Sequence, residues 1–344
     1  MPADHDVLTI AELGRALKAR RGMAPLRVGT RASPLALAQT ESFLAHLRAL
    51  CPFLRDFQVL KPEAFETTGD AIQDRRLAEI GGKGLFAKEI HEALLAGTID
   101  LAVHSLKDLE TPLPEGILLA CVLPREDARD VLVLGPRLRE AGGGEAADPF
   151  ALLPQGAVIG TSSVRRQAQL LARRPDLEVR LLRGNVGTRL AKLERGEADA
   201  TLLARAGLVR LGLVGTVPHL VLGPEEMVPA AGQGIIGVTV RSEDHELAAL
   251  LAAVEDRAAR AVATAEREML AALDGSCRTP IGGYARIEGE ALVLTGLVAR
   301  ADGTFHLKRT EAAPPAEAAR LGRALGEALR EAAPPDIFAA DIFA

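Results

Sequence analysis

The alternation of hydrophobic and polar positions predicts a strand, a tight turn and a helix between residues 26 and 50. Gly29 allows the turn, and Ser33 and Pro34 suit the N-cap and the first turn of the helix. The apolar residues of the helix recur three and four positions apart, which places them on one face: Phe43, Leu44, Leu47 and Leu50. We therefore expect the folded part of the chain to begin near Leu26.

The same pattern returns later in the chain. Residues 157–174 again predict a strand, a Gly-Thr turn and a helix that begins at a serine. Residues 94–105 and 193–204 share a helix end, a glycine, an aspartate and an apolar strand in the same spacing. Strands that alternate with helices are typical of α/β domains. The repeats favour two similar α/β domains that face each other, although unrelated α/β chains also produce matches of this length by chance.

The C-terminal residues follow a different pattern, which predicts a small α+β domain. A long helix is expected over 254–273, a hairpin over 291–310, and then a helix with Leu321, Leu325 and Leu329 along one face. We expect the chain to divide into an N-terminal extension (1–23), α/β domain 1 (24–127 with 233–252), α/β domain 2 (128–232) and a C-terminal α+β domain (253–344).

Composition limits the function. Of 344 residues, 48% are hydrophobic and 25% are charged, so the chain can build substantial cores. A net charge of −5 and only 3% aromatic residues argue against a partner that is a nucleic acid or a membrane surface. No apolar run reaches the roughly 18 residues of a membrane helix. Residues 1–23 lack the apolar core of a secretory signal, so we expect a soluble cytoplasmic protein.

The three cysteines, Cys51, Cys121 and Cys277, follow no spacing that is typical of a disulfide framework or a zinc site. Cys277 lies in the turn-rich stretch LDGSCRTPIGGYA (273–285), where Arg278 would favour the thiolate. A lone cysteine is more often an idle, buried thiol. The polar, flexible surroundings of Cys277 favour instead a thiol that carries a group.

Several loops place cationic or hydroxyl side chains beside a glycine or at the start of a helix. These loops are GTRAS, GGKG, GTSSVRR, LLRGNVGTRL and AGLVRLG, and they contain Arg31, Ser33, Lys83, Ser163, Arg165, Arg166, Arg183, Arg189 and Arg210. Helix N-termini bind anions, and arginine adds a planar fork for carboxylate or phosphate. One such loop is weak evidence, because most arginines only solvate a surface, but several at equivalent turns predict a site for a polyanion. Neither GxxxxGK[ST] nor GxGxxG is present, so a nucleotide is a poor fit.

The stretch VHSLKD places Lys107 and Asp108 at the end of a buried strand, where α/β proteins usually hold their sites. The Asp108 carboxylate could stabilise a cation or move a proton; the alternative is a surface ion pair in a turn. Asp70, in TTGD, is either a supporting residue of the site or part of an Asx turn. We expect His104, within the strand, to be a core histidine with a hydrogen-bond partner.

Together these stretches resemble the porphobilinogen deaminase family, whose members are also called hydroxymethylbilane synthases. The resemblance runs from about Arg27 to the final helix and rests on GTRASPLAL, TTGD, GGKGLFAKE, DLAVHSLKD, REDARD, GTSSVRRQAQL, LRGNVGTRLAKL, PAAGQGIIGV and GSCRTPIGGYA. It implies two α/β domains like those of periplasmic binding proteins around a cleft, plus a third domain that bears a cysteine.

The resemblance also implies an activity. Cys277 would carry a dipyrromethane cofactor through a thioether. Four porphobilinogen molecules would be joined head to tail, each losing ammonia, before hydrolysis releases hydroxymethylbilane. Asp108 would be the catalytic residue. The family's cofactor-binding positions are matched by Lys83, Lys107, Asp108, Ser163, Arg165, Arg166, Arg183 and Arg189, and its substrate-binding positions by Arg31, Ser33, Arg183, Arg189 and Arg210. Such an enzyme is a transferase of porphyrin and haem biosynthesis, a cytoplasmic monomer with no metal, nucleic-acid or membrane partner.

Three positions depart from the commoner pattern of the family. Glu79 stands where some members have lysine, Glu110 where proline is frequent, and Thr239 where glutamate is frequent. Residues 1–23 have no counterpart that the resemblance places. None of these differences involves Cys277, Asp108 or the paired arginines.

The main alternative is a non-enzymatic, two-lobed anion-binding protein, which would need neither Cys277 nor Asp108. The effector domain of a transcriptional regulator would need a basic DNA-binding region before Leu26, and a thiol hydrolase would need a histidine partner for Cys277. The sequence offers no obvious candidate for either feature.

Overall fold

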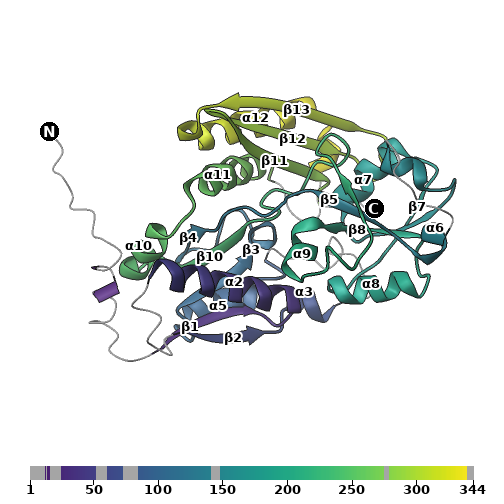
Figure 1. The fold of residues 1–344 in the computed structure, drawn as a ribbon. Coiled ribbons are helices and arrows are strands. Elements are labelled where there is room, and N and C mark those ends of the chain that lie inside the picture. The colour runs from purple at the N-terminus through teal and green to yellow at the C-terminus, as the bar shows by residue number, and fades with distance from the viewer. Residues whose placement is uncertain are drawn as a thin grey trace.

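The computed structural model describes residues 12, 14, 15, 25–51, 60–72, 84–140, 148–274 and 279–338. These residues form two five-stranded sheets and one three-stranded sheet. Figure 1 shows the first five-stranded sheet at the lower left, the second at the right and the three-stranded sheet at the top. None of the helices in the described part of the chain combines the length and the apolar composition that a membrane crossing requires.

The first lobe is built around a mixed sheet. β1 pairs in parallel with β2 and β3, and β10 runs antiparallel to both β3 and β4. In sheet order the strands are β2 (Leu60–Phe65), β1 (Leu26–Arg31), β3 (Leu101–Ser105), β10 (Ile236–Arg241) and β4 (Ile117–Val122). The helices are α2 (Pro34–Leu50), α3 (Thr68–Ala71), α5 (Lys88–Leu95) and α10 (His245–Ala253), with the 3-10 helix η2 (Leu106–Asp108) after β3.

The second lobe repeats this plan. β6 pairs in parallel with β7 and β8, and β5 runs antiparallel to both β8 and β9. In sheet order the strands are β7 (Glu178–Arg180), β6 (Val158–Gly160), β8 (Ala200–Ala204), β5 (Asp130–Leu134) and β9 (Leu220–Leu222). The helices are α6 (Pro136–Glu140), α7 (Val164–Arg173), α8 (Val186–Glu194) and α9 (Arg205–Arg210), with the 3-10 helix η3 (Pro149–Leu152).

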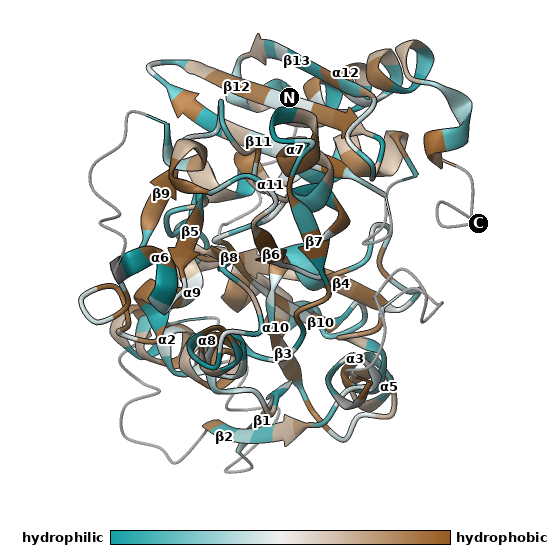
Figure 2. Cartoon of the chain, turned by 90° about the vertical axis from the view of Figure 1, so that its right-hand side faces the viewer, coloured by the Kyte–Doolittle hydropathy of each residue, from teal (hydrophilic) through white to brown (hydrophobic). Residues whose placement is uncertain are grey.

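The two sheets are equivalent strand for strand, which confirms the predicted pair of similar α/β units. The antiparallel strand of the first sheet, β10, comes after all strands of the second, so the chain crosses between the lobes twice. The residue limits of the domains stay a prediction. Figure 2 shows hydrophobic residues along β3 and β5, the interior strands of the two sheets.

The local predictions for the first lobe hold in detail, with one exception. β1 begins at Leu26, and the Ser33 side chain caps α2 by accepting a hydrogen bond from the Ala36 backbone N–H at 3.3 Å. Phe43, Leu44 and Leu47 are buried in the core of this lobe. Leu50 is the exception: it is 43% exposed because it is the last residue of α2 and lies beyond the packed part of the helix.

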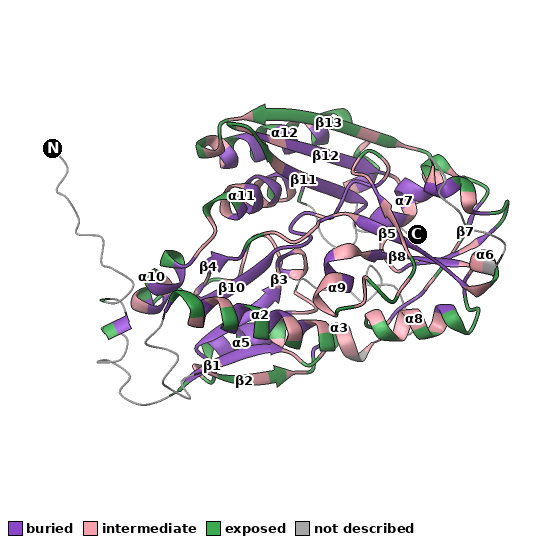
Figure 3. Cartoon of the chain, in the orientation of Figure 1, coloured by how far each residue is buried: buried purple, intermediate pink, exposed green. Residues whose placement is uncertain are grey.

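The C-terminal part has the predicted α+β pattern. Its antiparallel strands are β11 (Ile281–Glu288), β12 (Ala291–Ala299) and β13 (His306–Ala313), and its helices are α11 (Arg257–Ala272) and α12 (Ala318–Ala332), with the 3-10 helices η4 (Pro315–Glu317) and η5 (Pro335–Phe338). The predicted stripe of α12 is buried through Leu321, Leu325 and Leu329. Figure 3 shows that β13 is exposed along most of its length while β12 is buried.

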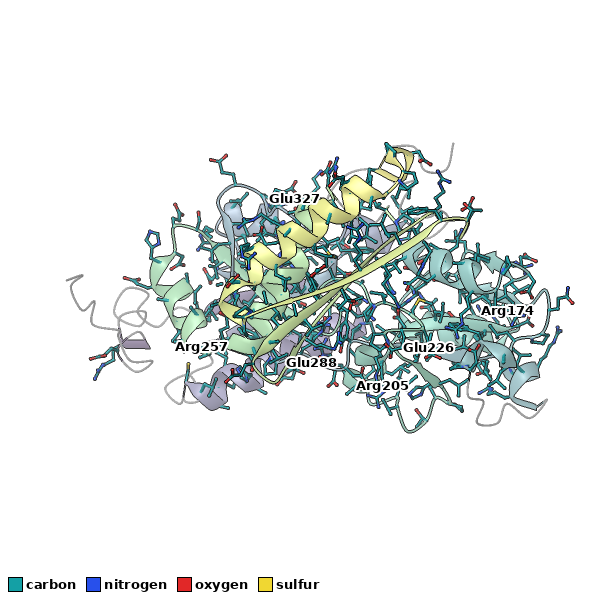
Figure 4. The ribbon with its side chains drawn as sticks, turned by 90° about the horizontal axis from the view of Figure 1, so that it is seen from above. Arg174, Arg205, Glu226, Arg257, Glu288 and Glu327 are labelled. Carbon is teal, nitrogen blue, oxygen red and sulfur yellow. The ribbon has the colours of Figure 1, made fainter. Side chains whose placement is uncertain are left out.

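Two glycines bring α11 and α12 into close contact. A Cβ added at Gly322 would lie 2.3 Å from the Ala265 carbonyl oxygen, and one added at Gly326 would lie 2.7 Å from that of Met269. Only glycine fits at such distances, so these positions set the spacing of the helix pair. Figure 4, seen from above, shows α12, which carries Glu327, lying alongside the C-terminal strands.

A buried carboxylate ties the C-terminal part to both segments that connect the lobes. Glu266 of α11 has no exposed side-chain surface and accepts hydrogen bonds from Arg125 Nη1 and from the backbone N–H groups of Gly232 and Ala285, each at 2.6 Å. Arg125 precedes β5 and Gly232 precedes β10. The two interlobe segments and the C-terminal sheet therefore meet at one side chain.

Candidate functional site

Arg31 and Asp108 come together at one edge of the first sheet. Arg31 ends β1 and Asp108 ends η2, and both follow the carboxyl ends of parallel strands. Nη1 of Arg31 donates to Oδ2 of Asp108 at 3.0 Å, while Nε and Nη2 donate to the two oxygens of Asp70 at 3.0 and 2.5 Å. The guanidinium also lies 4.3 Å from the ring centroid of Phe86. One arginine thus holds two partly exposed carboxylates in fixed positions.

Asp70 is a supporting residue of this site, the first of its two predicted roles. Besides Arg31, it accepts a hydrogen bond from the Thr67 hydroxyl at 2.8 Å. Burial favours a higher pKa for Asp70, but the hydrogen bonds and charge of Arg31, together with Thr67, outweigh burial and hold the pKa below its usual value. His104 is the predicted core histidine: it is buried, and its Nε2 lies 2.9 Å from the Thr239 hydroxyl.

In the second lobe two buried arginines share one buried carboxylate. Ser163 caps α7, and Arg165 and Arg166 lie in the first turn of that helix. Their Nη1 and Nη2 atoms lie 2.8 and 2.7 Å from the two oxygens of Asp130, which begins β5 and has no exposed side-chain surface. Burial opposes ionisation of Asp130, but the charges of the two arginines keep its pKa well below its usual value. Both arginines are buried in the protein interior, so they are not surface side chains that only interact with water.

Lys107 connects the two groups. Its Nζ lies 3.4 Å from Oε1 of Gln233, and Nε2 of Gln233 donates to Oδ1 of Asp130 at 2.9 Å. Removal from water, together with the charges of Arg166 and Arg165, lowers the pKa of Lys107 to about 8, against the opposite effects of Asp108 and Asp130. The charged form of Lys107 is therefore destabilised here, and a bound anion would stabilise it.

Three further arginines complete the cationic surroundings. Nη2 of Arg183 donates to the Gly69 carbonyl of the first lobe at 2.9 Å, so this bond crosses between the lobes. Arg189 of α8 donates to the Gly184 carbonyl at 2.8 Å; burial and the charges of Arg166 and Arg183 lower its pKa to about 10, against Asp108. Nη2 of Arg210 donates to the Gly234 carbonyl at 2.6 Å. The acceptors of these three hydrogen bonds are main-chain carbonyls.

The predicted site residues differ in how they are placed. The electrostatic contacts bring Asp108, Lys107, Arg165, Arg166, Arg183 and Arg189 into one neighbourhood, with Arg31 bonded to Asp108. Ser33 and Ser163 are seen as helix caps. Lys83 and Cys277 lie outside the described residues, as does Glu79.

The sequence prediction missed Asp130 and Gln233. Asp130 is the last residue of REDARD, which the sequence suggests is a linker, and Gln233 lies in the glycine-rich turn PAAGQG. A signal for Asp130 was present, because it is an aspartate at the start of an otherwise apolar strand. Nothing local marks Gln233, since its partners lie at positions 107, 128 and 130.

Two family models match the chain in succession. Residues 26–249 match "Porphobilinogen deaminase, dipyromethane cofactor binding domain", and residues 261–331 match "Porphobilinogen deaminase, C-terminal domain". The chain belongs to the porphobilinogen deaminase family. A porphobilinogen deaminase of Paracoccus denitrificans is 49% identical over 91% of this chain and 96% of its own length, and one of Lysinibacillus sphaericus is 48% identical over 84% and 88%.

Among solved structures, a periplasmic binding protein from Brucella ovis is similar over 72% of this chain and 70% of its own, with 17% identity and a TM-score of 0.41. The cofactor-domain match of the porphobilinogen deaminase family covers strands of both lobes, and the C-terminal match covers α11 to α12.

A porphobilinogen deaminase that carries its cofactor on a cysteine needs a reactive thiol. Cys51 and Cys121 are fully buried, and burial raises the pKa of the Cys51 thiol to about 11 and, with a contribution from Glu255, that of Cys121 to about 12. Because the thiolate is the nucleophile, neither is suited to attachment. Cys277 stands in the sequence between α11 and β11. The backbone N–H of Gly283, in β11, donates to the carbonyl of Pro229 at 2.9 Å, and Pro229 is four residues before Gln233 in the sequence.

Proposed function

We propose that the chain condenses four porphobilinogen molecules head to tail, with loss of ammonia, and releases hydroxymethylbilane by hydrolysis. This is the transferase activity of hydroxymethylbilane synthase, in porphyrin and haem biosynthesis. The observation that carries the proposal is the Asp108 carboxylate, bonded to Arg31 at 3.0 Å and surrounded by cations of both lobes. We place this activity in the cytoplasm and in a monomer that needs no metal, nucleic acid or membrane.

The residues present fit a dipyrromethane cofactor. Each of its pyrrole rings bears an acetate and a propionate, so the group is a compact polyanion. A cluster of arginine and lysine side chains favours such a ligand because arginine binds carboxylates in a bidentate manner. When bound, the cofactor supplies the pyrrole carbon to which the first substrate is joined. We assign its carboxylates to Lys83, Lys107, Ser163, Arg165, Arg166, Arg183 and Arg189.

Asp108 has the catalytic role in this proposal. Asp108 helps to protonate the amine of the substrate's aminomethyl group; when the C–N bond breaks, the electron pair then leaves with nitrogen as ammonia, and positive charge stays on the pyrrole and its methylene. A fixed carboxylate stabilises that charge. The pyrrole ring carbon that forms the new C–C bond would then lose a proton, and we assign Asp108 as its acceptor. Arg31 donates a hydrogen bond to the carboxylate at 3.0 Å and so orients it.

Substrate carboxylates are assigned to Arg31, Ser33, Arg183, Arg189 and Arg210. Arg31 is bonded to both Asp70 and Asp108, so it joins substrate binding to the catalytic carboxylate. Ser33, at the start of α2, adds a hydroxyl and a helix N-terminus. Cys277 is assigned as the point of covalent attachment through a thioether.

The intact mass of the denatured protein tests the proposal. Wild type should exceed its sequence mass by one dipyrromethane, and Cys277→Ser should not. Cys121→Ser is the matched control, because a buried thiol should carry nothing, and it should keep the excess mass. A wild-type protein that stays unmodified after incubation with porphobilinogen would contradict the proposal and favour a non-enzymatic anion-binding protein.

A further inference from the structure

A largely buried carboxylate lies two residues after Asp108. Glu110 is 13% exposed, and its Oε1 lies 3.5 Å from Nδ1 of His91 on α5, which is 4% exposed. Its other oxygen, Oε2, is buried and has no hydrogen-bond partner in the described part of the chain. Burying a charged group without hydrogen bonds is costly. A glutamate at this position therefore calls for a reason beyond filling space.

Glu110 also contacts two segments near the proposed cofactor site. A Cβ added at Gly84 would lie 2.6 Å from Oε2 of Glu110, so the end of the GGKG loop packs directly on the carboxylate. The Glu110 carbonyl accepts a hydrogen bond from Nη2 of Arg267 at 2.9 Å, and Arg267 belongs to α11, the helix that leads to the Cys277 segment. One residue thus touches α5, the GGKG loop and α11.

These contacts bear on the catalytic carboxylate through the main chain. Asp108 ends η2, and only Leu109 separates it from Glu110. Leu109 is buried, so the turn has apolar packing at one residue and polar contacts at the next. The contacts of Glu110 therefore lie on the same short backbone segment that places Asp108 against Arg31.

We propose that Glu110 is a positioning residue for Asp108. The Glu110 carboxylate lies between His91 and Gly84, and its carbonyl is bonded to Arg267. These contacts fix the position of the turn that carries Asp108 relative to the GGKG loop and to α11. The inference rests on the proposed function of Asp108.

Steady-state kinetics of Glu110→Ala and Glu110→Gln test the role. A misplacement of about 1 Å can cost about 100-fold in rate. Glu110→Ala should lower kcat about 10- to 100-fold, leave KM within about threefold and leave the dipyrromethane mass intact. Glu110→Gln keeps the size and one acceptor oxygen, and should recover most of the lost kcat. A role in stability alone would change the melting temperature without this split between kcat and KM.

Glu115→Gln is the matched control, because Glu115 is an exposed acid between the same strands, β3 and β4. It should match wild type. A folded Glu110→Ala whose kcat stays within about threefold of this control would overturn the proposal. If Glu110→Ala does not fold, Arg267→Met removes the donor to the Glu110 carbonyl and should still lower kcat several-fold; a normal kcat would refute the role. Wild type without turnover would refute the proposed function, and the positioning role with it.

Discussion

Asp130 fixes the positions of two neighbouring arginine side chains. Arg165 and Arg166 are neighbours at the start of α7, and two positive charges so close repel each other. One fully buried carboxylate offsets both, and the main chain accepts the remaining hydrogen bonds at Val228 and Leu202. The arrangement keeps one net positive charge for a ligand.

Asp130→Asn should therefore destabilise the protein strongly. Removal of one partner from a buried ion pair typically costs about 3–5 kcal/mol, because the other charge stays buried. Urea unfolding measures this free energy. Glu178→Gln is the control: it breaks an ion pair with Arg180 whose partners are 58% and 56% exposed, and should cost under about 1 kcal/mol. Equal losses in the two variants would contradict the role of Asp130.

The same substitution should change the acid limb of stability. The pKa of Asp130 in the folded protein lies below its usual value. Its contribution is thus fully present above about pH 4, the unfolded value, and is lost as pH falls through the folded pKa. Part of the stability loss of wild type below about pH 4 should be missing in Asp130→Asn.

At the scale of elements, the short helix α3 carries more of the site than its length suggests. Asp70 bonds Arg31, and the carbonyl of Gly69 accepts from Arg183 of the other lobe. The start of α3 is held by Glu89 of α5, whose Oε1 accepts from the backbone N–H of Thr68 at 2.9 Å and from its hydroxyl at 2.5 Å. A helix of four residues has little stability of its own, so the Glu89 contact fixes it.

Glu89→Ala should lower kcat/KM for porphobilinogen about 5- to 10-fold with little change in melting temperature. Removal of a helix cap typically costs about 1 kcal/mol. Here that loss should displace α3, and with it Asp70 and its partner Arg31. Glu92→Ala is the control on the same helix, where the acid makes only an exposed pair with Lys88 at 3.9 Å. A Glu89→Ala enzyme with the kinetics of that control would show that α3 holds its place without Glu89.

What the sequence predicted at this scale was local. Serine at the start of α2 and α7, and the apolar stripe of α12, follow from patterns within a few residues. The bond between Arg31 and Asp108 joins residues 77 positions apart, and no local pattern encodes it. Asp130 was missed for the same reason, since REDARD has the composition of a surface linker. No local pattern encodes the return of β10 to the first sheet, although residues 233–252 were expected in domain 1.

For the whole molecule, the decisive feature is that each lobe changes the chemistry of the other. Lys107 belongs to the first lobe, while Arg165 and Arg166, which help to lower its pKa to about 8, belong to the second. Arg183 of the second lobe bonds the main chain of the first. The charge of Lys107 is thus a property of the assembled lobes.

Assembly of the cofactor by apoprotein should therefore slow as pH rises above about 8. A carboxylate binds the charged form of Lys107, and the fraction of that form falls about tenfold for each pH unit beyond the pKa. Lys107→Arg keeps its charge and should give a flatter profile between about pH 7 and 9.5. The mass increase with time, after addition of porphobilinogen, measures the rate. A Lys107→Arg profile as steep as wild type would assign the decline to another group.

Loss of folding at high pH would be a competing explanation, and linkage gives it the opposite sign. Lys107 has a lower pKa in the folded protein than the value of about 10.4 in an unfolded chain. Between about pH 8 and 10.4 the unfolded chain therefore binds more protons, so the Lys107 contribution to stability rises with pH. Urea unfolding measures the free energy of unfolding of the apoprotein across this pH range. That free energy should rise with pH more in wild type than in Lys107→Arg. If cofactor assembly slows although Lys107 does not destabilise the protein, the loss of the positive charge on Lys107 is the cause.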